Sequence, residues 1–279
     1  MSCPRITPAA EPGAGEAPPF ALGAADAWLL AGGAALNGVG RWVLDPRTRD
    51  VPAPGLDRDD VGPGWDRRSI LVPNDDASSV STLFLAGAAL TPYLGTFAGG
   101  DPHPWNTRFH LAVLQTESVL LSMGAGHLLK VAFSRPRPYT YLADSQRPDG
   151  PSYATDGRHA FESFPSGHAT IAWSTSLAGV TFMDRRRPDL PPWVHFLGGM
   201  AAGGMATSTS LLRVDAAQHF PTDIAAGFLL GGTVGTGLVA LRVPAGEGAS
   251  RALLTGLAGA AVGTVIAFLL TPPTSPWVE

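Results

Sequence analysis

Long stretches without charged side chains alternate with short polar segments over most of this chain. Residues 109–133 are mostly apolar but contain Glu117, His127 and Lys130. Five other stretches contain no Asp, Glu, Lys or Arg at all: 78–100, 164–183, 193–212, 224–241 and 252–270. Runs of about 18–20 apolar residues match the hydrocarbon thickness of a bilayer. Gly, Ala, Ser and Thr are frequent inside these runs, as is usual where membrane helices approach closely.

These runs predict an all-α fold, a polytopic membrane helix bundle of about six core transmembrane helices. Residues 252–270 would form an additional C-terminal helix. Residues 20–44, interrupted by Asp26, Asn37 and Arg41, are a weaker candidate for a span. The alternative is a compact soluble all-helical protein whose core helices are rich in Ala and Gly. So many long uncharged runs in one chain favour the membrane-integral interpretation.

The polar segments indicate the domain organisation. Residues 1–19 are rich in Pro, Ala and Gly without periodicity, which predicts a disordered leader. Residues 20–279 would then form a single membrane-integral domain. Residues 45–76 contain many Asp, Arg, Pro and Gly and are expected to be a loop. Their aspartates lack the spacing and closing Glu of an EF-hand, so a solvated loop is favoured over a calcium site.

The order of the runs predicts which loops share an end of the bundle. The loops 134–163 and 213–222 would lie on one side together with 45–76. Short arginine-bearing loops are typical of the cytoplasmic face. We therefore expect the long loops at the outer face of a cell membrane of bacterial type, and at the cytoplasmic face the short loops 101–108, 184–192 and 242–251.

Composition excludes several classes of protein. The net charge of -4, without a basic tract, gives no sign of nucleic-acid binding. Cys3 is the one cysteine, so an internal disulfide and a cysteine-based metal cluster are excluded. The start of the chain lacks a basic segment followed by an apolar core, so a cleaved signal peptide is not expected. With a mean hydropathy of only +0.12, the polar residues must be segregated rather than dispersed.

The first stretch that carries chemistry runs from Lys130 to Pro138, at the C-terminal end of the run 109–133. Lys130, Arg135 and Arg137 place positive charge at one helix end. A lysine there can be a snorkelling anchor. However, so much positive charge at the end of a membrane helix is costly unless an anion compensates it. Phosphate is the natural anion, since lysine supplies a point charge and arginine a planar fork of donors.

The second stretch is Phe164-Pro-Ser-Gly-His168, which opens the run 164–183. Ser166 and Gly167 can begin a helix, where free backbone N–H groups and the helix dipole favour an anion. His168 in the first turn is placed to protonate a leaving oxygen. Taken singly, this stretch is explained as well by an ordinary capped helix start with an incidental histidine.

The third stretch runs from Arg213 to Asp223 between two apolar runs. If a helix begins near Pro221, His219 and Asp223 are four residues apart and can lie on one face. A carboxylate there can hold the imidazole in one tautomer and leave its far nitrogen free to attack. Arg213 offers donors to phosphate oxygens. A helix-end histidine beside a solubilising aspartate is the alternative, but the position of all three stretches at helix ends on one predicted side favours a shared site.

In order and spacing, the three stretches resemble the motifs of the type 2 phosphatidic acid phosphatase (PAP2) superfamily, in its integral-membrane branch. The superfamily also includes bacterial acid phosphatases and vanadium haloperoxidases. The resemblance covers roughly residues 130–223, and the flanking runs agree with the membrane branch in number and order. The matching residues are Lys-x6-Arg-Pro at 130–138, Pro-Ser-Gly-His at 165–168 and Arg-x5-His-x3-Asp at 213–223.

The resemblance implies a membrane phosphatase, without metal or cofactor, that hydrolyses a lipid phosphate or diphosphate through a phosphohistidine intermediate. His219 would attack phosphorus, Asp223 would orient it, and His168 would protonate the leaving group. Phosphoryl transfer requires mainly positioning and charge compensation. Phosphatidate, phosphatidylglycerol phosphate and isoprenyl diphosphates are all compatible substrates. The phosphoryl oxygens would be bound by Lys130, Arg137, Arg213 and the backbone of Ser166 and Gly167.

Leu212 departs from the family pattern, which usually has Ser immediately before the arginine of the third motif. Loss of a hydroxyl contact to phosphate would weaken binding by about 1 kcal/mol. Ser210, two residues away, does not simply replace it. This departure leaves room for a catalytically silent lipid-binding protein, whereas His168, His219 and Asp223 favour an enzyme. Vanadate-dependent halide oxidation is a further alternative, disfavoured because the chain is short and membrane-spanning.

Three charged or titratable residues near the first motif need their own interpretation. Glu117 lies 13 residues before Lys130, about 20 Å along a helix, so it is expected to pair within the bundle. His127 is one helical turn from Lys130 and is expected to pack. Arg137 rather than Arg135 has the spacing from Lys130 that favours it as the phosphate ligand.

Overall fold

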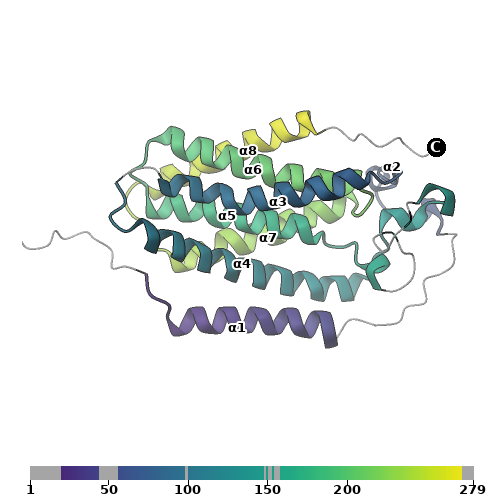
Figure 1. The fold of residues 1–279 in the computed structure, drawn as a ribbon, viewed down its shortest axis with the longest axis horizontal. Coiled ribbons are helices and arrows are strands. Elements are labelled where there is room, and N and C mark those ends of the chain that lie inside the picture. Colours follow the sequence, from purple (N-terminus) through teal and green to yellow (C-terminus); the bar gives the residue numbers. More distant parts are fainter. Residues whose placement is uncertain are drawn as a thin grey trace, which may run out of the picture.

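A computed structural model shows the chain as a bundle of α-helices (Figure 1). The structure describes residues 20–43, 56–97, 100–147, 149, 153 and 158–271, so the predicted leader at 1–19 and the first part of the loop 45–76 lie outside the described residues. No strand occurs in these described ranges, and the all-α prediction is confirmed. The helices are α1 Ala24–Gly38, α2 Gly64–Arg68, α3 Asp75–Leu94, α4 Pro104–Phe133, α5 Gly167–Arg186, α6 Pro192–Asp215, α7 Pro221–Arg242 and α8 Ala249–Leu270.

The helix starts follow local signals in the sequence. Asn74 and Ser166 cap α3 and α5 with their side chains, each accepting a hydrogen bond from a backbone N–H of the first turn. Proline is tolerated at the first helical position because the N–H that it lacks would have no partner within the helix. It begins α4, α6 and α7 as Pro104, Pro192 and Pro221.

Helix α5 lies at the centre of the bundle, in contact with α3, α4, α6, α7 and α8. From Ala169 to Asp184 every side chain except that of Ile171 is buried. Several of these are hydroxyls that bond to protein rather than to water; Ser176, for example, donates to the carbonyl oxygen of Ala202 at 3.2 Å. The polar content of α5 is therefore compatible with a bundle in lipid, because neighbouring helices cover it.

Three helical segments are long and apolar enough to cross a membrane by length and composition, and they are Asp76–Phe97, α7 and α8. The other long helices of the described chain fall short of this measure for visible reasons. Helix α4 contains Glu117 and Lys130, and α5 is rich in buried hydroxyls. Several apolar helices in one bundle agree with the predicted membrane protein.

Two helix pairs are in backbone contact through glycines, α5 with α7 and α6 with α8. A Cβ added at Gly231 of α7 would lie 2.2 Å from the carbonyl oxygen of Thr170. One added at Gly263 of α8 would lie 1.9 Å from the carbonyl oxygen of Met200. Such close approach requires glycine. In contrast, α6 and α7 are consecutive in the chain but barely touch each other.

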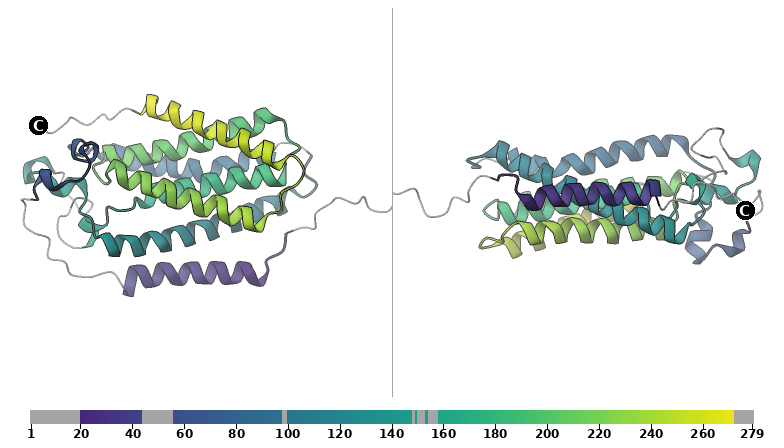
Figure 2. Two further views of the ribbon diagram at one scale, coloured as in Figure 1. Left: turned by 180° about the vertical axis from the view of Figure 1, so that it is seen from behind. Right: turned by 90° about the horizontal axis from the view of Figure 1, so that it is seen from below.

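The loops meet at the two ends of the bundle as the topology predicted (Figure 2). At one end, the N–H of Tyr139 donates to the carbonyl oxygen of Ala217 at 3.3 Å, which joins the loops after α4 and α6. At the other end, Arg185 donates to the carbonyl oxygen of Val243 at 2.7 Å, which joins the ends of α5 and α7. All three predicted motifs therefore lie at the same end.

Candidate active site

His219 lies in the loop between α6 and α7, two residues before α7 begins at Pro221. The chain turns sharply after α6: Ala217 has a φ of 51°, and the N–H groups of Gln218 and His219 donate back to the carbonyl oxygen of Arg213 at 3.1 and 3.2 Å. His219 is only 2% exposed. The predicted start of a helix near Pro221 is confirmed, but His219 precedes that helix and does not lie on its face.

The hydrogen bond made by His219 determines which ring nitrogen is free. Nδ1 lies 2.7 Å from the carbonyl oxygen of Ser163. Because a carbonyl oxygen only accepts, Nδ1 must carry the proton and Nε2 of the neutral ring must present a lone pair. Burial, and then the positive charges of Arg137, Lys130 and Arg213, lower the pKa of His219 well below its ordinary value. The imidazole is therefore neutral at physiological pH and nucleophilic at Nε2.

Asp223 supports His219 indirectly. Its Oδ2 lies 3.9 Å from Nδ1 of His219, too far for a hydrogen bond. Instead the carboxylate accepts hydrogen bonds from the Ser163 hydroxyl at 2.5 Å and from the Phe220 N–H at 2.8 Å. The expected direct contact between Asp223 and the imidazole is thus replaced by a chain through Ser163, whose hydroxyl binds Asp223 and whose carbonyl binds His219.

The second motif is attached to the third at the start of α5. The N–H of Ser166 donates to the carbonyl oxygen of Asp223 at 3.1 Å. A Cβ added at Gly227 of α7 would lie 2.9 Å from the carbonyl oxygen of Ser166, so α5 and α7 are in close contact at this point. Gly167 and His168 are the first two residues of α5, where backbone N–H groups have no partner within the helix. His168 is half-buried.

Three cations, Lys130, Arg137 and Arg213, come from three different elements and surround His219; they are referred to below as the cationic cage. NH1 of Arg137 lies 3.5 Å from Nε2 of His219. All three cations act electrostatically on both His219 and His168. Their hydrogen-bond partners are neutral oxygens: a backbone carbonyl for Lys130, carbonyls and an amide for Arg137, and a hydroxyl for Arg213.

The cationic cage has no direct ion-pair partner within the described residues, although the carboxylates of Glu162 and Asp223 act on Lys130 and Arg137 from a distance. Across the described residues, none of its three members forms an ion pair with a carboxylate. Nε of Arg213 is buried without a hydrogen-bond partner. Buried like charges are stable only with a counter-charge, and Lys with two Arg is a donor set suited to phosphate. The cage therefore fits an anion beside Nε2 of His219.

Asp66 is a functional candidate that sequence analysis missed, as is its pairing with Arg135. Arg135 forms ion pairs with Asp223 at 2.6 Å and with Asp66 at 2.8 Å, and its guanidinium lies 4.2 Å from the ring centre of Phe220. Asp66 also accepts a hydrogen bond from the N–H of Thr222 at 3.1 Å. Arg135 thus braces the start of α7, which agrees with the preference for Arg137 as the residue that faces the anion.

The expectation that the segment 45–76 is a solvated loop is wrong for Asp66, which is fully buried in α2. Asp66 pairs with Arg135 and Thr222 because the segment folds back over the end of the bundle. Several other aspartates near it in the sequence are exposed, so the composition of the segment does not distinguish Asp66 from them.

The hydroxyl missing at Leu212 is not replaced by Ser210. The Ser210 hydroxyl donates within α6 to the carbonyl oxygen of Ala206 at 2.8 Å. Instead Ser78 of α3 accepts a hydrogen bond from NH1 of Arg213 at 2.8 Å. A hydroxyl from a different helix therefore lies beside this arginine, a neighbour that the linear motif could not reveal.

The remaining residues singled out from the sequence lie away from the cage. Glu117 pairs with Arg242 at 3.3 Å, and Arg242 also pairs with Asp26. The expectation that Glu117 pairs within the bundle is confirmed. His127 packs against Gly40, in the short π-helical segment Val39–Val43 that follows α1. Within the described ranges, no group of three or more His, Cys, Asp or Glu is arranged to hold a metal ion.

Comparison with known proteins agrees with this geometry. The family model described as PAP2 superfamily matches residues 111–246, a range that contains all three motifs. An undecaprenyl-diphosphatase from Sulfolobus acidocaldarius is 29% identical over 114 residues, which cover 41% of this chain and 47% of the relative. The chain thus spans about half the length of this curated relative. No solved structure matches the chain.

Proposed function

Residues 111–246 are a PAP2-superfamily region, and from that premise we propose that the protein is a membrane phosphatase that hydrolyses a lipid phosphate or diphosphate. The observation that carries the proposal is the cationic cage around the free Nε2 of His219, whose three members form no ion pair among the described residues. Among substrates, an isoprenyl diphosphate is favoured because the curated relative is an undecaprenyl-diphosphatase.

The reaction begins with the attack of His219 on the terminal phosphorus. A bond forms between Nε2 and phosphorus while the bond from phosphorus to the leaving oxygen breaks. The Nδ1–H bond to the Ser163 carbonyl stabilises the positive charge that the ring acquires. The negative charge of the bound substrate offsets the cage and allows His168, in the first turn of α5, to carry a proton, which it gives to the leaving oxygen. Water then attacks phosphorus, His168 takes its proton, and phosphate leaves with restoration of neutral His219.

The cationic cage stabilises the charge on the three equatorial oxygens of the phosphoryl group. Lys130, Arg137 and Arg213 supply positive charge, and the first N–H groups of α5, at Gly167 and His168, point their dipole toward the anion. No step of this scheme requires a metal ion, since positioning and fixed charge supply the stabilisation.

The site is assigned to the outer face of the membrane. We base this orientation on the short loops at the opposite end, each of which contains arginine next to an apolar helix, among them Arg185, Arg186, Arg187 and Arg242. Such loops stay cytoplasmic. The catalytic end, with its longer polar loops, would then meet lipid headgroups from the outside.

The test is phosphate release by the purified full-length protein in detergent micelles, from undecaprenyl diphosphate and from a phosphatidate. We expect the wild type to release phosphate from at least one of them and His219→Ala to release none above background. His103→Ala is the matched control, because His103 is exposed before α4 at the other end of the bundle. A brief reaction with substrate labelled in its terminal phosphate should label the wild type and His103→Ala, and not His219→Ala.

Two outcomes would overturn the proposal. Full phosphate release by His219→Ala would exclude the histidine mechanism. Binding of lipid phosphate by the wild type without any release would identify a catalytically silent lipid-binding protein, the alternative that Leu212 leaves open.

A further inference from the structure

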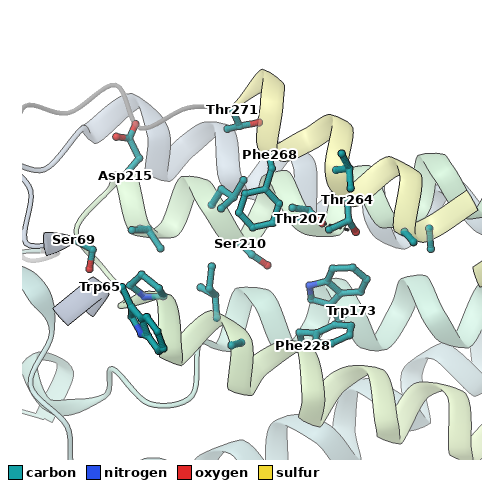
Figure 3. A pocket seen from close by; sticks show the side chains of 18 of the residues that line it. Trp65, Ser69, Trp173, Thr207, Ser210, Asp215, Phe228, Thr264, Phe268 and Thr271 are labelled. Carbon is teal, nitrogen blue, oxygen red and sulfur yellow. Dashed lines mark hydrogen bonds between the residues drawn. The ribbon is translucent and has the colours of Figure 1, made fainter. Parts of the chain in front are cut away.

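An apolar groove of about 840 Å³ lies between α7 and the α6–α8 pair, with α5 as its floor (Figure 3). Several of its hydroxyls are hydrogen-bonded within the protein: Thr207 bonds to Thr264 at 3.1 Å, and Ser210 bonds to the carbonyl oxygen of Ala206 at 2.8 Å. A volume of this size is within the range of small-molecule sites, about 300–1,000 Å³. The large side chains that line it include Trp173, Leu211, Ile224, Phe228, Val265 and Phe268.

The two walls of this groove belong to different helix pairs, each joined by close contacts at glycines. On one side, a Cβ at Gly259 of α8 would lie 2.0 Å from the carbonyl oxygen of Phe196 in α6. On the other, a Cβ at Gly235 of α7 would lie 2.4 Å from the carbonyl oxygen of Ser174 in α5. Since α6 and α7 barely touch, the space between the pairs stays open. The groove is thus a fixed consequence of helix packing.

One end of the groove lies at the turns that carry the catalytic residues. Val214 lines it immediately after Arg213, and Pro221 lines it between His219 and Asp223. We infer that the groove receives the single long hydrocarbon chain of the lipid whose phosphate occupies the cationic cage, which makes a polyisoprenyl phosphate or diphosphate the favoured substrate. This inference rests on the proposed function.

Helix α8 forms one wall of the groove and lies beyond residues 111–246, so this wall is a feature that the family match does not include. In a bilayer the surrounding lipid tails are as apolar as the groove, so burial alone gives no affinity. The groove acts through shape: rigid walls hold the chain in one direction and so align the headgroup with the cage. Its effect is expected on the KM of long-chain substrates.

The experiment narrows the groove from each wall and compares two substrates with the same headgroup. Ala261 on α8 and Ala225 on α7 both line the groove and are exposed to it, whereas Ala258 on α8 is exposed but does not line it. KM and kcat are measured for Ala261→Phe, Ala225→Phe and the control Ala258→Phe, with undecaprenyl diphosphate and with isopentenyl diphosphate. We expect the two groove variants to raise KM for undecaprenyl diphosphate by about tenfold, with isopentenyl diphosphate unaffected and the control equal to the wild type.

Each other outcome overturns a defined part of this scheme. Unchanged KM in both groove variants, an equal effect in Ala258→Phe, or an equal effect on both substrates would overturn the groove as the chain site. If one groove variant does not fold, the variant of the opposite wall decides. Phosphate release by the wild type from phosphatidate alone would overturn the polyisoprenyl assignment, and no release from either of these diphosphates or from phosphatidate would overturn the proposed function itself.

Discussion

The two buried histidines at opposite ends of α6 show what separates a reactive imidazole from a structural one. His195, in the first turn of α6, contacts the carboxylate of Asp184 through Nδ1, and the cavity beside it measures only about 30 Å³. His219, just after α6, instead binds a neutral carbonyl and stands among three cations. The first histidine is compensated by its own protein, whereas the second requires an external anion.

The same comparison shows the limits of sequence spacing. The four-residue spacing of His219 and Asp223 predicted that the carboxylate holds the imidazole directly in one tautomer, and the structure places Ser163 between them. The actual histidine–aspartate pair, Asp184 with His195, joins two helices and has no regular spacing. Close packing of α5 on α6 brings Asp184 to His195, whereas His219 lies in the loop before α7 and not on the face of that helix.

The largest expected effect contrasts the two histidines directly. His219→Ala should lower kcat by about 10⁴-fold or more, because the nucleophile is lost. His195→Ala should keep turnover but lower the free energy of unfolding by about 1–3 kcal/mol, since Asp184 loses its buried partner. Phosphate release and thermal unfolding of both variants measure this. An inactive His195→Ala with unchanged stability would contradict the distinction.

The next effect contrasts Arg137 of the cationic cage with Arg242, which pairs with carboxylates at the other end of the bundle. Arg137→Leu should lower kcat/KM by about 10²–10³-fold, because a donor to the transition state is removed. Inorganic phosphate should raise the Tm of the wild type and do so less for this variant. Arg242→Leu is the control, since Arg242 is paired with Glu117 and Asp26 and should affect stability rather than the response to phosphate. Equal responses to phosphate in the two variants would count against the cage.

A smaller loss of kcat is expected for two variants that test whether Asp223 acts on His219 through Ser163. Asp223→Asn disturbs both the Arg135 pair and the Ser163 hydrogen bond, whereas Ser163→Ala removes only the latter and keeps the carbonyl that binds His219. We expect a loss in kcat of about 10–100-fold for Asp223→Asn and a loss nearer the lower limit for Ser163→Ala. A double variant whose loss in kcat equals the product of the two single losses would show that Asp223 acts on His219 by another route.

The smallest expected effect is a pH dependence of stability. Because the pKa of His219 is lowered by burial and by the cage, the native chain stays unprotonated where the unfolded chain binds a proton. The contribution of this group to stability is therefore full above the ordinary histidine pKa of about 6.5 and is lost as pH falls below it. The Tm of the wild type should fall more than that of His219→Asn between about pH 7 and pH 5. The reverse order would mean that native His219 gains a proton.

Much of the fold follows from local information, because the uncharged runs are long and their ends carry strong signals. The runs 224–241 and 252–270 predicted α7 and α8 to within a few residues, and the prolines and caps explain where helices begin. The order of the runs was sufficient to bring the three motifs to one end. The residues of the cationic cage are conspicuous in sequence for the same reason, since charge at the ends of apolar helices is rare.

The sequence by itself determined the helices, their ends and the residues that carry the chemistry, since these depend on periodicity, length and side-chain type. Only the tertiary structure decided which partners those residues have. Ser163 reaches His219, Asp66 reaches Arg135 and Ser78 reaches Arg213 from segments far away in the chain. The groove beside α7 also depends on tertiary packing, since it exists only because glycines join α5 to α7 and α6 to α8. The periodicity of a sequence reports local structure and does not say which distant segments touch. These contacts are therefore decided by how the helices and loops pack.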